Sequence, residues 1–215
     1  MRGEQHDGTD ESRRELTFTE RARRAQLIEA TIELVADRGY PSTSLAGIAE
    51  RAGITKAAVL YHFPSKDALV RAAYEHVLEA LVSTVSAAVA AETDGLAAYI
   101  RSMIGHLREH PGHTRMIVEA MGHGDGDHDP EARWRPLAEI ITVARDARGA
   151  PTDEARTTAI IIGGAIDAIV AERLRDPRYD TAAAAEQLIQ MAGATMTPHG
   201  HGHEPTHVPG ASSHP

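Results

Sequence analysis

The residues with the clearest capacity for chemistry lie between positions 54 and 69, in the run ITKAAVLYHFPSKDAL. Six of them carry a side-chain hydrogen-bond donor: Thr55, Lys56, Tyr61, His62, Ser65 and Lys66. Hydroxyl, imidazole and ammonium groups bind phosphate oxygens, and a lysine ammonium can also reach a guanine edge. The sequence shows no Ser/His/Asp arrangement, no paired carboxylates, no P-loop and no GxGxxG motif. We therefore expect a binding protein rather than an enzyme, and we expect no cofactor.

Histidine is the second candidate chemistry, because the chain has 13 histidines and no cysteine. They gather near one predicted helix end, in the acidic loop after it and in the C-terminal tail: His106, His110, His113, His123, His128, His199, His201, His203 and His207. Imidazoles bind Zn²⁺ and related cations, so a metal-sensing or metal-binding protein is the alternative hypothesis. The alternative is that these histidines bind no metal. A histidine is favourable at a helix C-terminus, and histidines in such loops and tails are commonly just solvated.

Charge is unevenly distributed along the 215 residues. The whole chain has a net charge of −9, whereas residues 1–71 contain 11 basic and 11 acidic residues. This asymmetry suggests a division of labour between the two parts and permits nucleic-acid binding by the first. No apolar run is long enough to span a membrane, and the N-terminus has no signal-peptide pattern. We therefore expect a cytoplasmic protein.

The elements that would position these residues are all helices, since no segment alternates with period 2 and Ala is abundant. Thr19 is the expected N-cap of the first helix, and Pro111 is expected to end the fifth. The predicted helices cover residues 20–38, 44–52, 55–61, 66–90, 93–110, 113–123, 130–148, 152–175 and 180–196. Residues 1–18 and 197–215 are expected to be a disordered arm and a disordered His-rich tail. We predict an all-α protein.

The two short helices have the spacing of a helix-turn-helix. Ala49 permits close approach, Gly53 lies where the turn requires a positive φ, and Val59 faces back into the corner. An ordinary αα-corner would satisfy the same spacing. In a DNA-binding helix-turn-helix the exposed face of the second helix contacts DNA, whereas in an ordinary αα-corner it is only solvated.

The run GYPSTSLAGIAERAGITKAAVLYHFPSKDALVRAAYEHV, residues 39–77, resembles the TetR family of one-component transcriptional regulators. The resemblance extends from Arg21 to Leu81, and residues 161–189 also look like the last two helices of that family. It implies a helix-turn-helix DNA-binding domain at 19–81 and an effector-binding and dimerisation domain at 82–196. It also implies a repressor that binds a palindromic operator as a homodimer and is released by a small-molecule effector. The chain departs from the family at Leu60, often aromatic, and at Ala46 and Gly47, where a charge is common.

A recognition helix that starts at Thr55 would place its first residues nearest the base edges. Lys56 is expected to contact guanine, while Ala57, Ala58 and Leu60 offer apolar contacts to thymine methyl groups. Tyr61 and His62 would bind phosphates. We expect Thr43 and Lys66 to hold the DNA backbone on either side. The arginines at the N-terminus could touch phosphates as well, and a solvated tail is the alternative: Arg13, Arg14, Arg21, Arg23 and Arg24. Core packing remains the alternative for Tyr61, and Phe63 is expected in the core.

The last two predicted helices are too apolar to face water on all sides, so we expect a dimer interface there. Its expected residues are Ile162, Gly163, Ile166, Ile169, Val170 and Leu188. Burial inside one protomer is the alternative. By resemblance the middle of the chain should hold an effector pocket, with candidate lining residues Tyr99, Met103, Leu107, Met116, Glu119, Met121 and Trp134. Plain core packing is the alternative for each.

Overall fold

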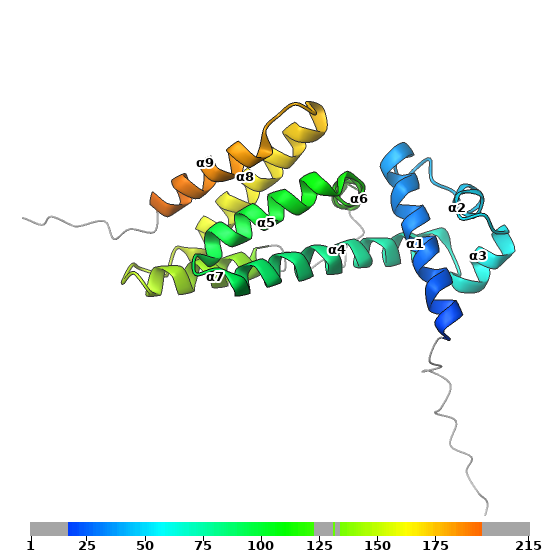
Figure 1. Ribbon diagram of the computed structural model, residues 1–215, viewed down its shortest axis with the longest axis horizontal. Helices are drawn as coiled ribbons and strands as arrows, with labels where there is room; N and C mark the ends of the chain where they lie inside the picture. Colours follow the sequence, from blue (N-terminus) through cyan, green and yellow to red (C-terminus); the bar gives the residue numbers. More distant parts are fainter. Residues whose placement is uncertain (1–16, 123–130, 132–133, 195–215) are drawn as a thin grey trace, which may run out of the picture.

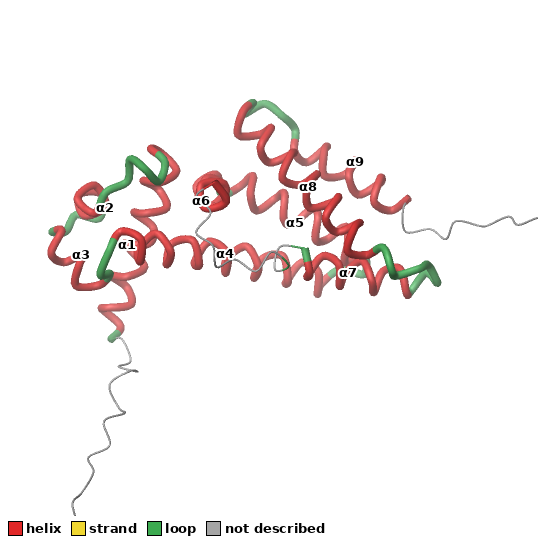
Figure 2. The backbone as a smooth tube through the Cα atoms, turned by 180° about the vertical axis from the view of Figure 1, so that it is seen from behind, coloured by secondary structure: helices red, strands yellow, loops and turns green. Residues whose placement is uncertain are grey.

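The computed structural model describes residues 17–122, 131 and 134–194. Within these residues it contains helices and no strand, which confirms the predicted all-α class (Figure 1). The helices are α1 (Phe18–Arg38), α2 (Leu45–Arg51), α3 (Lys56–His62), α4 (Lys66–Ala91), α5 (Gly95–Glu109), α6 (Pro111–Gly122), α7 (Arg135–Asp146), α8 (Ala155–Arg175) and α9 (Thr181–Ala194). Helices α1–α3 form a small unit at one end, and the long α4 leads from it to the remaining helices (Figure 2). None of the described helices has the length and apolar character needed to cross a bilayer.

Helix α1 begins earlier than predicted. Its N-cap is Thr17 and not Thr19, because Thr17 and Glu20 form a capping box. The Thr17 hydroxyl accepts from the Glu20 N–H at 3.3 Å, and the Glu20 carboxylate accepts from the Thr17 N–H at 2.8 Å. Two backbone donors are satisfied in this way, which Thr19 could not achieve without an acidic residue three positions on. Residues 17 and 18, predicted to belong to the disordered arm, therefore belong to this helix and its cap.

The core of the N-terminal unit is built from one apolar stripe of each of its helices. Its fully buried side chains include Leu27 of α1, Ile48 of α2, Val59 of α3 and Leu69 of α4. Phe63 is 2% exposed and lies in the same core, as expected. Short helices such as α2 and α3 are marginal alone, so this shared burial is what holds them in place.

Helix α4 starts at its predicted cap, Ser65, whose hydroxyl accepts from the Ala68 N–H at 3.1 Å. Its buried residues recur along one side: Leu69, Ala73, Val77, Leu81 and Val85. Ala73 and Val77 pack with residues of α1 and α6, whereas Leu81 and Val85 pack with the C-terminal helices. The helix therefore takes part in both cores and connects them.

The α5–α6 corner differs from the predicted break. Helix α5 ends at Glu109 with His110 as its C-cap, as the following proline suggests. Pro111 nevertheless opens α6, predicted to start at residue 113, because a proline at the first helical position has no N–H that needs a partner. Thr114 then ties the two helices together, since its hydroxyl donates to the Leu107 carbonyl at 2.6 Å.

The C-terminal bundle consists of α5, α7, α8 and α9, with α4 along one side (Figure 1). Its core contains Ile100 and Ile104 of α5, Leu137 and Ile141 of α7, and residues of α8 and α9. At the surface, Arg101 of α5 pairs with Glu186 of α9 at 2.5 Å. This mutual hydrogen bonding lowers the pKa of Glu186. Helix α7 starts at Arg135 rather than near residue 130.

Candidate nucleic-acid interface

The turn between α2 and α3 fixes the angle at which α3 leaves the unit. Gly53 has φ +67°, a backbone conformation that glycine adopts without a Cβ clash. The Ile54 N–H donates to the Ala49 carbonyl at 3.0 Å across this turn. Ala49, Ala52 and Val59 are all buried beside it. The predicted Ala–Gly–Val spacing thus produces a helix-turn-helix.

Helix α3 presents one face outward. Thr55 is its N-cap, and the Thr55 hydroxyl accepts from the Ala58 N–H at 3.1 Å. Lys56 and Ala57 are exposed in the first turn, and Ala58 is half-buried. In the last turn Leu60 and Tyr61 are exposed, with Tyr61 72% accessible. A 72% exposed tyrosine does not pack in a core, so the core alternative for Tyr61 does not describe this structure.

The back of α3 is held by α1. The Arg24 guanidinium donates to the His62 carbonyl and lies 4.0 Å from the centre of the Phe63 ring. Gln26 of the same helix donates to the Ala52 carbonyl at 3.0 Å. Arg24, expected at phosphates, is therefore engaged in fixing the end of α3. Sequence reasoning missed Gln26, since no local pattern marks a side chain that caps a helix in another part of the chain.

Thr43 does not lie on the surface as its expected role required. Its side chain is 3% exposed, and its hydroxyl donates to the Gly39 carbonyl at 2.9 Å. The neighbouring Ser44 is exposed and is the N-cap of α2, accepting from the Gly47 N–H at 3.1 Å. The burial of Thr43 removes it from the surface that could meet a ligand.

Lys66 lies at the start of α4, beside the loop that precedes α2. Its ammonium donates to the Tyr40 carbonyl at 3.3 Å and lies 3.9 Å from the centre of the Tyr40 ring. The Tyr40 hydroxyl in turn donates to the Asp67 carboxylate at 2.6 Å. Lys66 thus fastens the α1–α2 loop to α4, and only a half-buried ammonium is left to face outward.

The other basic side chain next to this surface is occupied. Arg51, in the last turn of α2, pairs with Asp37 at 2.9 Å and with Glu33 at 3.0 Å. Hydrogen bonding to Asp37 and then to Glu33 raises the pKa of Arg51 above its usual value. Arg51 therefore pairs with acidic side chains of α1 and holds α2 against that helix. Lys56 supplies positive charge on the exposed first turn of α3.

Comparison with known proteins addresses the same part of the chain. The sequence profile described as "Bacterial regulatory proteins, tetR family" matches residues 27–73. The HTH-type transcriptional regulator BetI of Burkholderia mallei (strain NCTC 10229) is 39% identical over 82 residues, which are 38% of this chain and 42% of that protein. BetI of Burkholderia ambifaria (strain MC40-6) is 44% identical over 73 residues, 34% of this chain and 38% of that one. The match therefore spans less than half the length of these relatives.

Residues 27–73 of the chain are therefore similar to the tetR family of bacterial regulatory proteins. Solved structures extend the likeness of fold beyond the N-terminal unit. A putative transcriptional regulator from Pseudomonas aeruginosa PAO1 aligns with TM-score 0.68 and 22% identity, over 81% of this chain and 88% of that one. A TetR-like transcriptional regulator from Rhodococcus sp. RHA1 gives TM-score 0.66 and 20% identity, over 81% and 95% of the two chains.

Most candidate effector-binding residues belong to packed cores. Tyr99, Met103, Leu107 and Trp134 pack in or against the core of the C-terminal bundle. Met116 is 1% exposed and packs between α1 and α4 in a separate cluster. The Glu119 carboxylate accepts from the Tyr40 N–H at 3.1 Å, and the side chain of Met121 lies outside the described residues. The predicted lining residues are thus divided between two cores.

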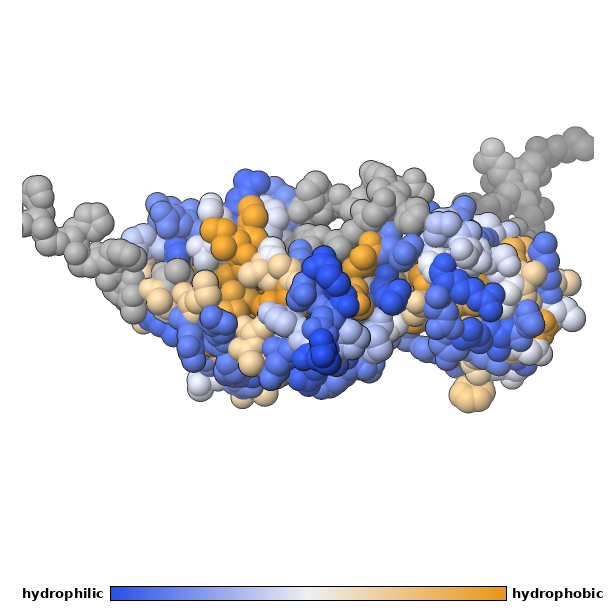
Figure 3. Space-filling model, turned by 90° about the horizontal axis from the view of Figure 1, so that it is seen from above, coloured by the Kyte–Doolittle hydropathy of each residue, from blue (hydrophilic) through white to orange (hydrophobic). Residues whose placement is uncertain are grey.

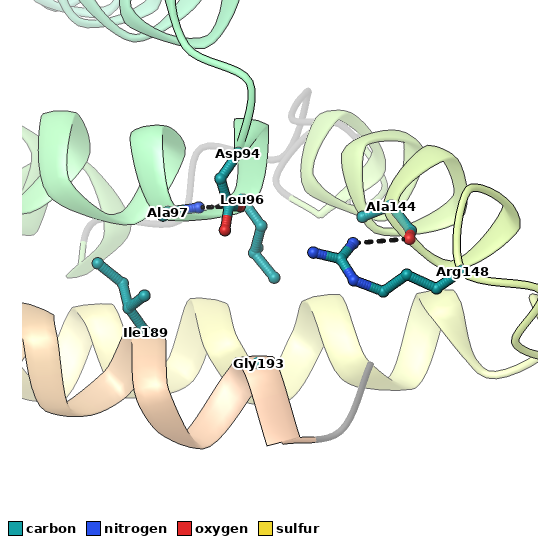
Figure 4. Close-up of a pocket in the computed structure, with 7 residues that line it drawn as sticks. All are labelled: Asp94, Leu96, Ala97, Ala144, Arg148, Ile189 and Gly193. Carbon is teal, nitrogen blue, oxygen red and sulfur yellow. Dashed lines mark hydrogen bonds between the residues drawn. The ribbon is translucent and has the colours of Figure 1, made fainter. Parts of the chain in front are cut away.

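A small pocket lies elsewhere, between helices of the C-terminal bundle (Figure 4). Its volume is about 20 Å³, and its lining comes from the start of α5, the end of α7 and α9: Asp94, Leu96, Ala97, Ala144, Arg148, Ile189 and Gly193. Asp94 accepts from the Ala97 N–H, and Arg148 donates to the Ala144 carbonyl. Both charged groups therefore serve helix ends, and the space admits no more than water-sized groups.

The residues expected at the dimer interface mostly face inward in the protomer. Ile162, Ile166, Val170 and Leu188 are buried in its own core, and Gly163 and Ile169 are half-buried. The outer face of α8 and α9 is formed by other residues: Ile160, Ile161, Gly164, Ala168 and Met191. Ile161 is 66% exposed and Met191 is 63% exposed. Figure 3, which looks onto the side of the molecule that carries α8 and α9, shows apolar surface over this part.

The histidines that the structure describes do not support the metal hypothesis. Within the part of the chain that the structure describes, no group of three or more His, Asp or Glu side chains is arranged to hold a metal ion. His106, His110 and His113 lie together, but as stacked and tilted rings. His123, His128 and the tail histidines lie outside the described residues.

Proposed function

We propose that this protein is a ligand-responsive transcriptional repressor that binds a palindromic operator as a homodimer. The observation that carries the proposal is the placement of α3, whose inner face is held by α1 and α2 while Lys56, Ala57 and Tyr61 remain exposed. A helix with one anchored face and one accessible face is the geometry that enters a major groove. The similarity of residues 27–73 to the tetR family supports the same assignment.

The proposed reading of DNA follows from the side chains on that face. Lys56 in the first turn contacts a guanine edge, and Ala57 and Leu60 meet thymine methyl groups. Tyr61 and His62, at the other end of α3, bind phosphates and set the register. Lys66 binds backbone phosphate with the part of its ammonium that Tyr40 leaves free. Thr43 is left out of this proposal because its hydroxyl is buried.

We propose that two protomers associate through the outer face of α8 and α9. Its exposed isoleucines and Met191 lie beside Gly164, where an added Cβ would meet nothing within 4 Å in the protomer. Small residues between larger apolar ones allow a second helix pair to approach closely. A two-fold dimer would present two α3 helices roughly 34–36 Å apart, matching one turn of DNA. The protein would act in the cytoplasm, where chromosomal DNA is found.

Release by an effector requires that the ligand bind the DNA-free conformation more tightly than the DNA-bound one. Helix α4 takes part in both cores, so a shift of α4 within the bundle would move α3. We propose the C-terminal bundle, with Trp134 and Met103 at the edge of its core, as the part that opens to admit an apolar small molecule. The name of the BetI relatives supports transcriptional regulation and does not identify this ligand.

DNA binding can be tested with the duplex that flanks the gene of this protein, followed by fluorescence anisotropy at several salt concentrations. Specific binding should weaken steeply with salt, as phosphate contacts release counterions. Ala57→Glu places a carboxylate on the exposed face of α3 and should lower affinity at least about tenfold through repulsion by phosphates. Ala87→Glu adds the same charge on the exposed side of α4 and should bind like wild type. Equal affinity of all three proteins, or no salt-dependent binding, would contradict the proposal.

A further inference from the structure

Three imidazoles meet at the α5–α6 corner and form what we call the histidine cluster: His106, His110 and His113. Their ring centres are 4.5, 4.8 and 5.3 Å apart. His106 Nε2 and His113 Nδ1 are 3.1 Å apart, within hydrogen-bond distance. One nitrogen must donate and the other accept, so at least one of these two rings has to be neutral.

Burial makes the neutral state the favoured one. His106 is 6% exposed, and burial followed by repulsion from His110 and His113 lowers its pKa. His113 is half-buried, and burial followed by repulsion from His110 lowers its pKa as well. Glu109 opposes the change at His106, and Glu29 opposes it at His113.

The charged groups that act on the cluster come from three helices. Glu29 belongs to α1, His76 to α4 and Glu109 to α5. Glu29 and His76 are 3.3 Å apart and both more than 40% exposed, and Glu109 pairs with Arg108 at 2.7 Å. Glu29 and Glu109 thus already have partners of their own. Little negative charge remains to stabilise a histidine cluster in which two rings are protonated.

The sign of the pH effect follows from the lowered pKa values. Around and below pH 6.5, the ordinary pKa of histidine, the packed corner binds fewer protons than an opened one. The free energy that favours the packed corner over the opened one therefore has its full value above pH 6.5. It decreases as the pH falls below that value. The loss continues until the pKa values of the packed state are passed.

The corner matters because it positions α6 against the DNA-binding unit. A Cβ placed on Gly112 would lie 3.3 Å from Ile32 Cγ2 and 3.9 Å from Ala36 Cβ, both on α1. Met116 is buried with Ile32 and Val35 of α1. At the far end of α6, the Glu119 carboxylate accepts from the Tyr40 N–H of the α1–α2 loop. Helix α6 thus joins the bundle to α1 independently of α4.

We propose that the histidine cluster is a proton-operated switch, in which protonation below about pH 6 separates the rings, displaces α6 from α1 and lowers operator affinity. The effect on DNA rests on the proposed function, because a loosened DNA-binding unit no longer holds two α3 helices at operator spacing. The opposite direction would be expected from His62 alone, since protonation of a phosphate contact strengthens binding. A fall in affinity with acid is therefore diagnostic of the cluster.

The first test uses a double variant that keeps a hydrogen bond between positions 106 and 113 but has no titratable imidazole at either position. His106→Gln presents an amide near Nε2, and His113→Asn presents one near Nδ1. Operator affinity of the wild type should fall several-fold between pH 7.5 and 5.5, because the packed corner takes up protons less readily than the opened one. The double variant should lack this fall, and the control His76→Gln, outside the cluster, should retain it. An equal fall in wild type and double variant would overturn the proposal.

A second test fastens α6 to α1. The chain has no cysteine, and the 3.9 Å Cβ separation of positions 36 and 112 suits a disulfide. Oxidised Ala36→Cys/Gly112→Cys should bind operator with the same affinity at pH 7.5 and 5.5, and reduction should restore the acid sensitivity. An acid response that persists in the oxidised protein would contradict a role for α6 displacement.

A third readout does not depend on DNA. The methyl NMR signal of Met116, buried between α1, α4 and α6, should shift between pH 7.5 and 5.5 in the wild type and stay constant in the double variant. If no duplex binds at any pH but this signal responds, the proposed function fails and the switch stands. An unchanged Met116 signal in the wild type would overturn the switch. All samples contain EDTA, and a response that appears only with added zinc would also overturn it.

Discussion

Lys56 is the only lysine or arginine of α3, and it lies in the first turn on the exposed face. Its replacement by alanine should cost about 1–3 kcal/mol of operator binding and relax the preference for guanine at one position of each half-site. Binding of operators substituted at each position would show this. Uniform weakening on every sequence, with a salt slope reduced by about 1, would instead make Lys56 a phosphate contact.

At the residue scale, the type of a side chain told which residues could bind a phosphate. It did not tell which of them are exposed and free to do so. Thr43 and Ser44 are adjacent hydroxyl residues, yet Thr43 is buried against the Gly39 carbonyl and Ser44 caps α2. Arg24 and Arg51 have the guanidinium that suits a phosphate, but both are engaged within the protein. Which donor faces outward depends on contacts between helices, and those are not encoded in local spacing.

The turn between α2 and α3 provides a test at the scale of the element. Gly53→Ala should destabilise the protein by about 1–2 kcal/mol, the cost of a left-handed conformation for a residue with a Cβ. No atom lies within 4 Å of the Cβ position, so the effect reports backbone strain alone. Thermal or urea unfolding would measure it.

Gly105→Ala is the matched control for that substitution. Gly105 lies inside α5, its added Cβ would also meet nothing within 4 Å, and its φ is not positive. Replacing it should stabilise the protein by up to about 1 kcal/mol, the helix propensity difference between the two residues. Similar effects of the two substitutions would show that the α2–α3 turn does not depend on glycine.

Helix ends were predicted well where a local motif sets them. Helices α3 and α4 begin within a residue of their predicted starts at 55 and 66. Thr55 and Ser65 are their N-caps, and a short polar side chain that accepts from the N–H three residues later acts locally. The start of α1 was wrong because the capping box at Thr17 outweighs a lone threonine at position 19. The start of α6 was wrong because Pro111 suits the first position of a helix as well as the end of the previous one.

The arrangement of the whole molecule can be tested on the outer face of α8. Ile161→Asp places a charge at the centre of the proposed dimer surface and should convert the dimer to a monomer at micromolar concentration. Light scattering or sedimentation would report the mass. Val143→Asp on α7 is the control, since Val143 is 71% exposed and Ile161 is 66% exposed. An unchanged mass for Ile161→Asp, or a monomeric wild type, would contradict the proposed interface.

At this scale the sequence did not decide which residues of α8 face the core of the protomer. The apolar run of α8 predicted that more than one side of the helix is shielded from water. It did not tell which side packs in the core of the same protomer. Ile162 and Ile166 turned out to pack inside, and Ile160 and Ile161 outside. A helix that is apolar all round leaves this choice to its neighbours.

The sequence by itself determined the helical class and the helix-turn-helix. Each depends on short-range physics: helix propensity, capping hydroxyls, and a glycine whose φ only a residue without a Cβ adopts readily. Only the tertiary structure decided that Thr43 is buried, that Arg24 holds the end of α3 and Gln26 the end of α2, and that His106 and His113 meet at the α5–α6 corner. Those features depend on which distant helices pack together, and that is settled by burial of the whole apolar surface rather than by any local pattern.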